Sequence, residues 1–453
     1  MADNTHLRLK RLRSSAVRSG EADQAFGFQE RLAESEWFSS DKIKTYQLGH
    51  LKRLAGFAAL NAPYYASKID MLALMEAKSL REALDIIPIQ SRYDLATQSL
   101  SFRSATLPQG HHKAGERISS GSSGQIIAVE GTNISFAWQH ALNFRAQLWA
   151  GRKFDLPMAV IRKFGPELEP SEGIVRDRWD DEAVLPVKTG PANFLATTYS
   201  VEHQWKWLAG VKPAYLMSYP SIIRQFAILA AAEKRSSVVL KGISTVGETV
   251  SAELRDDARR FLGADIYDVY SAEEVGVIAS QCPTCRRYHI QSEAIIVEIV
   301  DMAGKPCAAG EIGRVIVTPL FNFATPLLRY ELGDMAEAGS PCACGRGLGV
   351  INRVVGRYRN LLTLPDGQHF WPSMGSRAWQ KIIPIKRHQF RQVALDRMEV
   401  WMVVETQPTQ AAQDEVRAII ASRLPGAFTI DFQFVDDIPN GSGGKFEEFV
   451  SLL

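Results

Sequence analysis

The sequence predicts an α/β fold: a large N-terminal body of parallel and mixed sheets with helices and a β-rich subdomain, followed by a small α+β C-terminal domain. Three observations indicate this fold. The first hundred residues have the polar–apolar periodicity of helices. From about Ser119, strand-like runs alternate with helical segments, which is typical of a largely parallel sheet covered by helices. Beyond Cys282, strand-like runs follow one another directly, as antiparallel strands do.

The elements of the body follow in order from these patterns. A helix in "SDKIKTYQLGHLKRLAGFAALNAPYY" is expected to stop at "NAP", because proline cannot continue a helix. The alternating part then gives strand, helix, strand, helix and strand in "DLPMAVIRKF", "SIIRQFAILAAAEKR", "SVVLKGISTVGE", "VSAELRDDARRFLG" and "GADIYDVYS". The antiparallel part contains "YHIQSEAIIVEIVDMAGKPC" and "EIGRVIVTPL", which are joined by a glycine-containing turn.

The C-terminal part is a separate small unit. After "VGRYRNLLTLPDGQHFWP" we expect a hairpin in "HQFRQVALDRMEVWMVVE", a helix in "AAQDEVRAIIASRL", a strand in "FTIDFQFVDDI" and a glycine-rich tail. We therefore divide the chain into a body of residues 1–356 and a C-terminal lid domain of residues 357–453. Within the body, residues 1–100 are mainly helical and residues 282–350 are β-rich.

Composition and charge exclude several classes of protein. The net charge is +2, which gives no electrostatic reason to expect a nucleic-acid partner. The basic stretch His6–Arg18 is a solvated amphipathic terminus, or else a contact for RNA or a membrane. No apolar run approaches the ~20 residues that span a bilayer, and the N-terminus lacks a secretory signal. Clustered cysteines indicate reduced thiols, so we expect a cytoplasmic protein. Whether the chain forms a homodimer stays open.

The stretch "SSGSSGQIIAVEGT" raises the first question about function. Its glycines let the backbone approach a ligand closely, successive N–H groups can form an anion-binding nest, and its hydroxyls suit phosphate oxygens. It is not a P-loop, because no Gly-Lys-Ser/Thr closes it. A flexible linker is the alternative. The candidate phosphate-binding residues are Ser119, Ser120, Gly121, Ser122, Ser123 and Gly124.

Three further motifs carry charged side chains. In "YDVYSAEEVG", Glu273 or Glu274 lies at a strand end and can hold Mg²⁺ beside a triphosphate, or can stabilise a helix N-terminus. In "LLRYELGDMAEAG", Asp334 can accept both hydroxyls of a ribose or can cap a turn. In "NGSGGKFEEF", Lys445 follows four small residues and can stabilise a developing negative charge, or can be solvated.

Two pairs of cysteines have the spacing of a metal site. Cys282 and Cys285 form "CPTC", and Cys342 and Cys344 form "CAC". Four thiolates on two turns can hold a structural Zn²⁺ ion tetrahedrally, and His289 can replace one of them. The alternatives are a chance cluster of buried thiols and a zinc ribbon that binds nucleic acid, although the near-neutral charge opposes the latter. The fifth cysteine, in "GKPCAAG", is expected to be an ordinary turn residue.

The order of these motifs resembles that of the adenylate-forming superfamily of acyl-CoA synthetases, and more finely the phenylacetate–coenzyme A ligase family. The resemblance rests on "SSGSSG", on "YSAEEVG" followed by a cysteine and "HIQSEAIIVEIVD", on "LLRYELGD", "CACGRG" and "INRVVGR", and on the closing glycine–lysine. It covers roughly Arg117 to Lys445. Within it, Gln125-Ile126-Ile127 follow the loop where a proline and a basic residue are usual, and Ser271 replaces a glycine. Glu273 stands where a threonine is common, and Arg359 stands where an acidic hinge residue is common.

The resemblance implies a role for each matched position. Residues 119–124 would surround the β- and γ-phosphates of ATP, and Lys445 would bridge the substrate carboxylate and ATP. Mg²⁺ would be bound by Glu274, and the acyl pocket would lie partly along "YLMSYPS". The implied contacts are adenine at Gly247 and Glu248, nucleotide and acyl group at Tyr270 and Ser271, ribose at Asp334 with Arg357, acyl wall at Tyr219, Pro220 and Ala272, and hinge at Arg359.

The implied activity is ATP-dependent, AMP-forming ligation of a carboxylic acid, with an aromatic acid expected from the family. The acid would form an acyl-adenylate with release of pyrophosphate, and a thiol such as coenzyme A would then accept the acyl group. In the superfamily a small C-terminal domain rotates between these two steps. Two alternatives stay open: acyl transfer to an amine or to a carrier-protein thiol, and a non-catalytic nucleotide-binding scaffold of the same fold.

Overall fold

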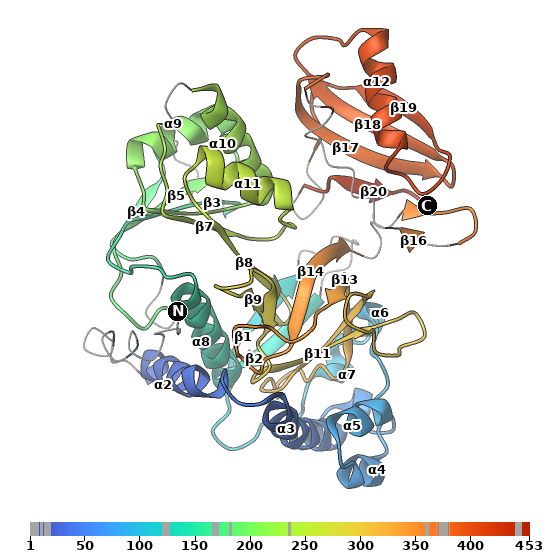
Figure 1. Cartoon of the computed structure of the whole chain (residues 1–453). Helices are drawn as coiled ribbons and strands as arrows, with labels where there is room; N and C mark the ends of the chain where they lie inside the picture. Colours follow the sequence, from blue (N-terminus) through green and yellow to red (C-terminus); the bar gives the residue numbers. More distant parts are fainter. Residues whose placement is uncertain are drawn as a thin grey trace.

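The fold is described from a computed structural model of the whole chain (Figure 1). The structure describes residues 9, 12, 20–119, 127–164, 172–180, 184–233, 237–357, 362–367, 369–370, 379, 381–439 and 446–453. Among these residues, no helix combines the length and the apolar character that crossing a membrane requires.

The N-terminal part is helical, as the periodicity predicts. The long helix α3 (Ser40–Asn61) begins where the hydroxyl of Ser39 accepts a hydrogen bond from the Lys42 amide, and it ends just before Pro63. The helices of this part pack against the antiparallel half of the main sheet. They are α2 (Gly20–Ser35), α3, η2 (Pro63–Tyr65), α4 (Met71–Glu76), α5 (Leu80–Ile86), α6 (Arg92–Thr97) and α7 (Ser99–Phe102).

One sheet runs through the whole body, in the order β11-β12-β13-β14-β10-β9-β8-β7-β6-β3-β5-β4. Its parallel half contains β3 (Met158–Arg162), β5 (Ala192–Ala196), β6 (Tyr215–Ser218), β7 (Gly242–Thr245) and β8 (Ile266–Ala272), with β4 (Ile174–Arg176) as an antiparallel edge. Helices cover both faces of this half, as a parallel sheet requires. They are α9 (Val201–Val211), α10 (Pro220–Ala232) and α11 (Ala252–Phe261) on one face, and α8 (Asn133–Trp149) with α2 on the other.

The antiparallel half continues the same sheet. Strand β8 pairs in parallel with β7 on one side and antiparallel with β9 on the other, so the sheet is not interrupted at Cys282. The β-rich segment expected after Cys282 therefore extends the parallel sheet (Figure 1). Its strands are β9 (Gly276–Gln281), β10 (Tyr288–Ile290), β11 (Ile295–Val300), β12 (Ile312–Pro319), β13 (Tyr330–Ala338) and β14 (Val350–Arg357).

A separate hairpin flanks the serine–glycine stretch. Strands β1 (Lys113–Ser119) and β2 (Ile127–Thr132) pair antiparallel, with Ser119 opposite Ile127. Residues 120–126, which connect them in the chain, lie outside the described residues. Helix α8 begins directly after β2 with a capping box between Thr132 and Ser135.

The C-terminal domain has the predicted hairpin, helix and strand. Its sheet has the order β19-β18-β17-β20 and packs on one helix around a core that includes Trp379 and Phe390. Figure 1 shows this domain as a distinct unit beside the α10–α11 side of the body. Its elements are β17 (Ile385–Ala394), β18 (Arg397–Val404), α12 (Gln410–Ala421), β19 (Thr429–Phe434) and β20 (Phe449–Ser451), preceded by β15 (Leu362–Thr363) and β16 (His369–Phe370).

Candidate functional site

Three of the predicted nucleotide-binding residues lie in contact with one another, and they come from strands β8, β13 and β14. The hydroxyl of Tyr270 donates to Oδ2 of Asp334 at 2.7 Å, and Nε of Arg357 lies 3.0 Å from Oδ1 of the same carboxylate. Asp334 and Arg357 are direct partners in the β13–β14 pairing. Burial, and then the neighbouring Asp334 charge, hold the pKa of Tyr270 well above its ordinary value, so its hydroxyl stays a donor. The Asp334 carboxylate is fixed on both sides, as a ribose acceptor requires.

Glu274 is buried and bound to a residue that the sequence motifs did not indicate. Its Oε1 atom forms an ion pair with Arg92 and accepts a hydrogen bond of 3.1 Å from the Tyr330 hydroxyl. The other guanidinium nitrogen of Arg92 donates to the Ser119 hydroxyl at 3.0 Å. Arg92 therefore joins the start of the serine–glycine stretch to the candidate Mg²⁺ ligand.

The position of Arg92 follows from a short backbone bridge. Gln90 pairs with Tyr330, since its N–H donates to the Arg329 carbonyl and its carbonyl accepts from the Glu331 N–H, both at 2.9 Å. Ser91 then caps helix α6, which starts at Arg92. The only sequence signal was the periodicity of the first hundred residues, and periodicity does not show which distant strand a helix touches.

A hollow lies behind Glu274, with about 440 Å³ of space that is partly open to solvent. Arg117 is the cation on its wall, and the guanidinium lies 4.6 Å from the centre of the Phe136 ring. Burial lowers the pKa of Arg117, with Glu273 acting in the opposite direction. Gly276, at φ +89°, leaves the room that Arg117 and Gln139 occupy, because a Cβ there would approach both within 2.6 Å.

Glu248 follows β7 at the same sheet edge and makes contacts with protein groups. Its Oε2 accepts from the Ser221 N–H at 2.8 Å, and its Oε1 accepts from the Ser221 hydroxyl at 3.0 Å. Oε1 also accepts a hydrogen bond of 3.2 Å from the N–H of Phe446, a residue of the C-terminal domain. Burial raises the pKa of Glu248. Gly247, at φ +77°, makes the turn before it. The adenine contact expected at these two residues stays a prediction.

The expected acyl-pocket residues lie around the start of α10 and the end of β8. Tyr219 precedes the helix, and its hydroxyl accepts from the Lys163 N–H at 3.4 Å, while Pro220 is the buried first residue. Ala272 ends β8, and Ser271 beside it is exposed. A second hollow lies between α8 and strands β7 to β9, lined by Ala146, Gln147, Ala150, Ser244, Tyr267, Asp268, Val269, Ser280 and Gln281. In the part of the chain that the structure describes, the three predicted residues line neither hollow, so their acyl role stays a prediction.

Several predicted residues cannot be placed. Outside the described residues lie Ser120, Gly121, Ser122, Ser123, Gly124, Gln125, Arg359 and Lys445. Ser119 and Ile127 are the described residues that flank the loop. Arg357 is the last described residue before the hinge position, and Phe446 directly follows the lysine.

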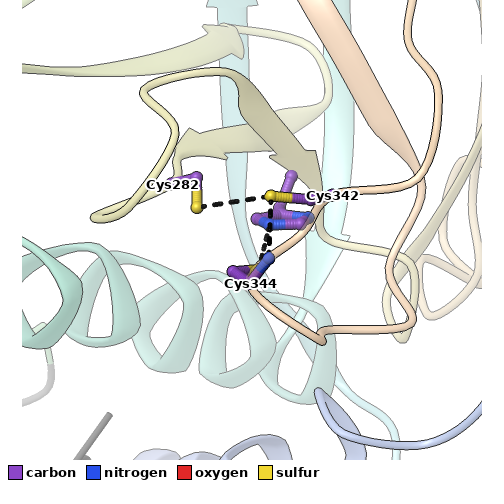
Figure 2. Close-up of side chains that lie close together, drawn as sticks. Cys282, Cys342 and Cys344 are labelled. Carbon is purple, nitrogen blue, oxygen red and sulfur yellow. Dashed lines mark hydrogen bonds between the residues drawn. The ribbon is translucent and has the colours of Figure 1, made fainter. Parts of the chain in front are cut away.

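The cysteines come together, and His289 joins them. Figure 2 shows the side chains of Cys282, Cys342 and Cys344 turned toward one another. The Sγ atoms of Cys282 and Cys342 are 3.9 Å apart, and Nε2 of His289 is 3.2 Å from Sγ of Cys344. One ligand atom from each of these four residues lies within 4.8 Å of all the others. Cys285 is also present, with its Sγ 3.1 Å from that of Cys342.

The donor set fits a tetrahedral zinc ion. Zinc–sulfur bonds of about 2.3 Å place two thiolates about 3.8 Å apart, close to the Cys282–Cys342 separation. Burial, and then the charge of Arg145, lower the pKa of His289 to about 4, so its ring is neutral and able to bind a metal at neutral pH. Five donors surround four coordination positions, and Cys285 and His289 are the two that compete for the fourth.

The cysteine cluster lies at one end of strands whose other ends carry the nucleotide-site residues. Strand β9 starts just after Glu274 and stops at Gln281, next to Cys282. Strand β14 starts after Cys344 and ends at Arg357. A metal ion in the cluster would therefore fix the strands that place Glu274 and Arg357.

The chain is similar to several proteins named as acyl-CoA ligases. The structure superposes on that of 2-hydroxyisobutyryl-CoA ligase in its postadenylation state with a TM-score of 0.70 and 18% sequence identity. The match covers 90% of this chain and 88% of the ligase chain. A curated phenylacetate–coenzyme A ligase from Thermus thermophilus is 25% identical over 356 residues, which are 75% of this chain and 76% of that protein. The chain has the fold of adenylate-forming CoA ligases.

Further comparisons concern the C-terminal domain and the range of enzymes that share the fold. Residues 364–451 match the family model of the CapK C-terminal domain. The thioesterification state of the same 2-hydroxyisobutyryl-CoA ligase gives a TM-score of 0.57, at 18% identity over 90% of this chain and 89% of that one. An amide bond synthetase from Marinactinospora thermotolerans gives 0.52, at 14% identity over 76% and 71% of the two chains. The adenylate-forming fold is thus shared with proteins named for two different acyl acceptors.

Proposed function

We propose that this chain belongs to the adenylate-forming superfamily and is an ATP-dependent, AMP-forming ligase that activates a carboxylic acid and transfers the acyl group to coenzyme A. The observation that carries the proposal is the pair of contact chains at one sheet edge. Ser119, Arg92 and Glu274 form the first chain, and Tyr270, Asp334 and Arg357 form the second. A phosphate loop, a carboxylate for the metal and a ribose acceptor are what adenylation needs.

The first half-reaction is positioning and charge neutralisation. The substrate carboxylate attacks the α-phosphorus of ATP, the bond to the β-phosphate oxygen breaks, and pyrophosphate leaves as the acyl-adenylate forms. Ser119 and the residues after it would hold the β- and γ-phosphates, and Asp334 would hold the ribose. Lys445 would neutralise the charge between the carboxylate and ATP.

Glu274 fits the role of a Mg²⁺ ligand. Arg92 and Tyr330 both contact Oε1 of Glu274. Among the described residues, none donates a hydrogen bond to Oε2. A Mg²⁺ ion held there would reduce the negative charge of the phosphates. Arg92 lies against the same carboxylate, so it would add a second positive charge beside the phosphates.

In the second half-reaction a thiol attacks the acyl carbon and AMP leaves. We expect coenzyme A as the thiol and an aromatic acid as the substrate, since the motifs resemble those of phenylacetate–coenzyme A ligases and the chain is similar to one such enzyme. The likeness to an amide bond synthetase keeps an amine as the second candidate acceptor.

We also infer that the cysteine cluster holds a structural zinc ion. Cys282, Cys342 and Cys344 would be ligands, with either His289 or Cys285 as the fourth. Four protein ligands close the coordination sphere, so the ion would support the fold and would not bind substrate.

The test is pyrophosphate release from ATP with a panel of aryl, aliphatic and amino acids, with hydroxylamine present to capture any acyl-adenylate. Lys445→Ala is compared with wild type, and Lys381→Ala, an exposed lysine of the same domain, is the matched control. We expect release that depends on one class of acid, falls steeply in Lys445→Ala and persists in Lys381→Ala. Coenzyme A or an amine is then added to identify the acceptor. Bound ATP without release for any acid would favour a non-catalytic nucleotide-binding protein.

A further inference from the structure

Glu248 connects the large body to the C-terminal domain. Its Oε1 atom accepts the N–H of Phe446 at 3.2 Å, although the two residues are 198 positions apart in the chain. Phe446 directly follows the predicted catalytic lysine, Lys445, in the sequence. A restraint on the Phe446 amide therefore acts one residue away from the group expected to assist adenylation.

Both partners of this contact are held firmly within their own domains. On the side of the body, Ser221 donates to Glu248 through both its N–H and its hydroxyl. On the other side, the Glu447 carbonyl accepts from Gln389 at 2.8 Å, and the Glu448 carbonyl accepts from the Phe390 N–H at 2.8 Å. The segment then enters the C-terminal sheet as β20, parallel to β17. The contact thus joins Glu248 to a segment that is hydrogen-bonded to the C-terminal sheet.

The other described contacts between the two domains involve more exposed side chains. Gln225 of α10 donates to the Lys386 carbonyl at 2.7 Å, and Arg224 lies 3.9 Å from Glu448. An exposed ion pair of that length contributes little to stability. Arg387 lies over the Phe446 ring at 4.1 Å, and its charge also acts on Glu248. Glu248 is therefore a charged group of the body that accepts a backbone hydrogen bond from the C-terminal domain and also faces the charge of Arg387.

The arrangement of the two domains matches one state of a relative better than another. The TM-score is 0.70 against 2-hydroxyisobutyryl-CoA ligase in the postadenylation state and 0.57 against the thioesterification state of the same enzyme. The contact between Glu248 and Phe446 thus belongs to an arrangement that resembles the postadenylation state more than the thioesterification state, and we call it the adenylation arrangement.

We propose that Glu248 is a positioning residue that holds the C-terminal domain in the adenylation arrangement by accepting the Phe446 amide. This inference rests on the proposed function and adds to it a residue that favours one half-reaction over the other. The proposal requires that the contact breaks when the domain rotates away, so loss of the contact lowers the population of the adenylation arrangement. The second half-reaction, for which the domain must leave, does not require it.

The first test measures the contact without using activity. Hydrogen–deuterium exchange of the full chain is followed by mass spectrometry in wild type, Glu248→Ala and the control Glu202→Ala, an exposed glutamate of α9. We expect faster exchange in Glu248→Ala in peptides that cover residues 446–451 and 385–390, with α12 unchanged. Exchange identical to wild type in those peptides would overturn the proposal.

The second test separates the two half-reactions, with the acid found in the panel above. In Glu248→Ala we expect pyrophosphate release to fall roughly tenfold, as for the loss of one charge-assisted hydrogen bond. Conversion of supplied acyl-adenylate to thioester, measured at saturating acyl-adenylate so that an adenine contact of Glu248 does not limit the rate, should fall much less than pyrophosphate release. An equal fall in both steps would contradict a positioning role. If wild type releases no pyrophosphate with any acid, the proposed function fails, whereas the exchange experiment still decides whether the contact holds the domain.

A proline at the donor position gives an independent check. Phe446→Pro removes the N–H that Glu248 accepts, and Phe446→Ala keeps the N–H and removes only the ring. We expect Phe446→Pro, and not Phe446→Ala, to reproduce the effect of Glu248→Ala. Combining Phe446→Pro with Glu248→Ala should add no further loss, because both changes remove the same hydrogen bond. Full additivity would contradict the proposed pairing.

Discussion

The hydroxyl of Tyr270 donates a hydrogen bond of 2.7 Å to the carboxylate of Asp334, which Arg357 holds from the other side at 3.0 Å. The tyrosine comes from the last parallel strand, β8, whereas the two charged residues come from the paired antiparallel strands β13 and β14. The ribose acceptor of the proposed site is therefore oriented across both halves of the sheet.

Tyr270→Phe is expected to weaken ATP binding. The change removes one donor to the Asp334 carboxylate, and a hydrogen bond to a charged group contributes about 1.5–3 kcal/mol, so the KM for ATP should rise by about tenfold or more. The rate at saturating ATP should change less, because the reacting groups remain. Steady-state kinetics with ATP as the varied substrate provide the measurement. A lower melting temperature with an unchanged KM would instead indicate a purely structural hydroxyl.

Arg92→Ala is expected to impair both stability and adenylation. It leaves the buried Glu274 carboxylate without its ion-pair partner, which costs about 3–5 kcal/mol in comparable sites. It also removes the donor to Ser119 at the start of the phosphate loop. Urea unfolding and pyrophosphate release measure the two effects. Arg81→Ala, which breaks a more exposed pair with Asp85, is the control and should leave pyrophosphate release unchanged. An Arg92→Ala protein as active as wild type would remove Arg92 from the site.

The sequence predicted the fold well where local patterns decide it. Alternating strand and helix periods indicated the parallel half, and the hairpin, helix and strand of the C-terminal domain were confirmed. The continuity of the sheet could not be predicted, because it depends on β8 pairing with β7 and β9 at once. The role of Arg92 was also hidden, since its position depends on the bridge between Gln90 and Tyr330, far apart in the chain. His289 joins the cysteines because β10 pairs with β9 next to Cys282.

Arg145→Leu is expected to destabilise the whole body. The Arg145 side chain is fully buried, forms ion pairs with Glu36 of the N-terminal part and Glu293 before β11, and donates to Gln291 at 2.7 Å. Removing the cation leaves the buried Glu293 carboxylate without its ion-pair partner, while Glu36 keeps its ion pair with Arg346, so the free energy of unfolding should fall by about 3–5 kcal/mol. Equilibrium urea unfolding gives the value. Combining Arg145→Leu with Glu293→Leu should recover part of the loss, and no recovery would show that the ring packing of Arg145 on Trp149 dominates.

Removal of metal from the cysteine cluster is expected to lower stability and then activity. The side chains of Cys282, Cys342 and Cys344 lie together (Figure 2). Their segments adjoin one end of strands β9 and β14, and Glu274 and Arg357 lie at the other ends of these strands. Elemental analysis of the purified chain should find one zinc ion per chain. Cys344→Ser should lose the ion and lower the melting temperature, while Cys307→Ser, which changes a cysteine outside the cluster, should retain both. His289→Ala and Cys285→Ala then identify the fourth ligand, because only the substitution that removes a zinc ligand should reduce the affinity of the protein for zinc. Full stability after complete removal of the metal would mean that these thiols are buried side chains without a metal role.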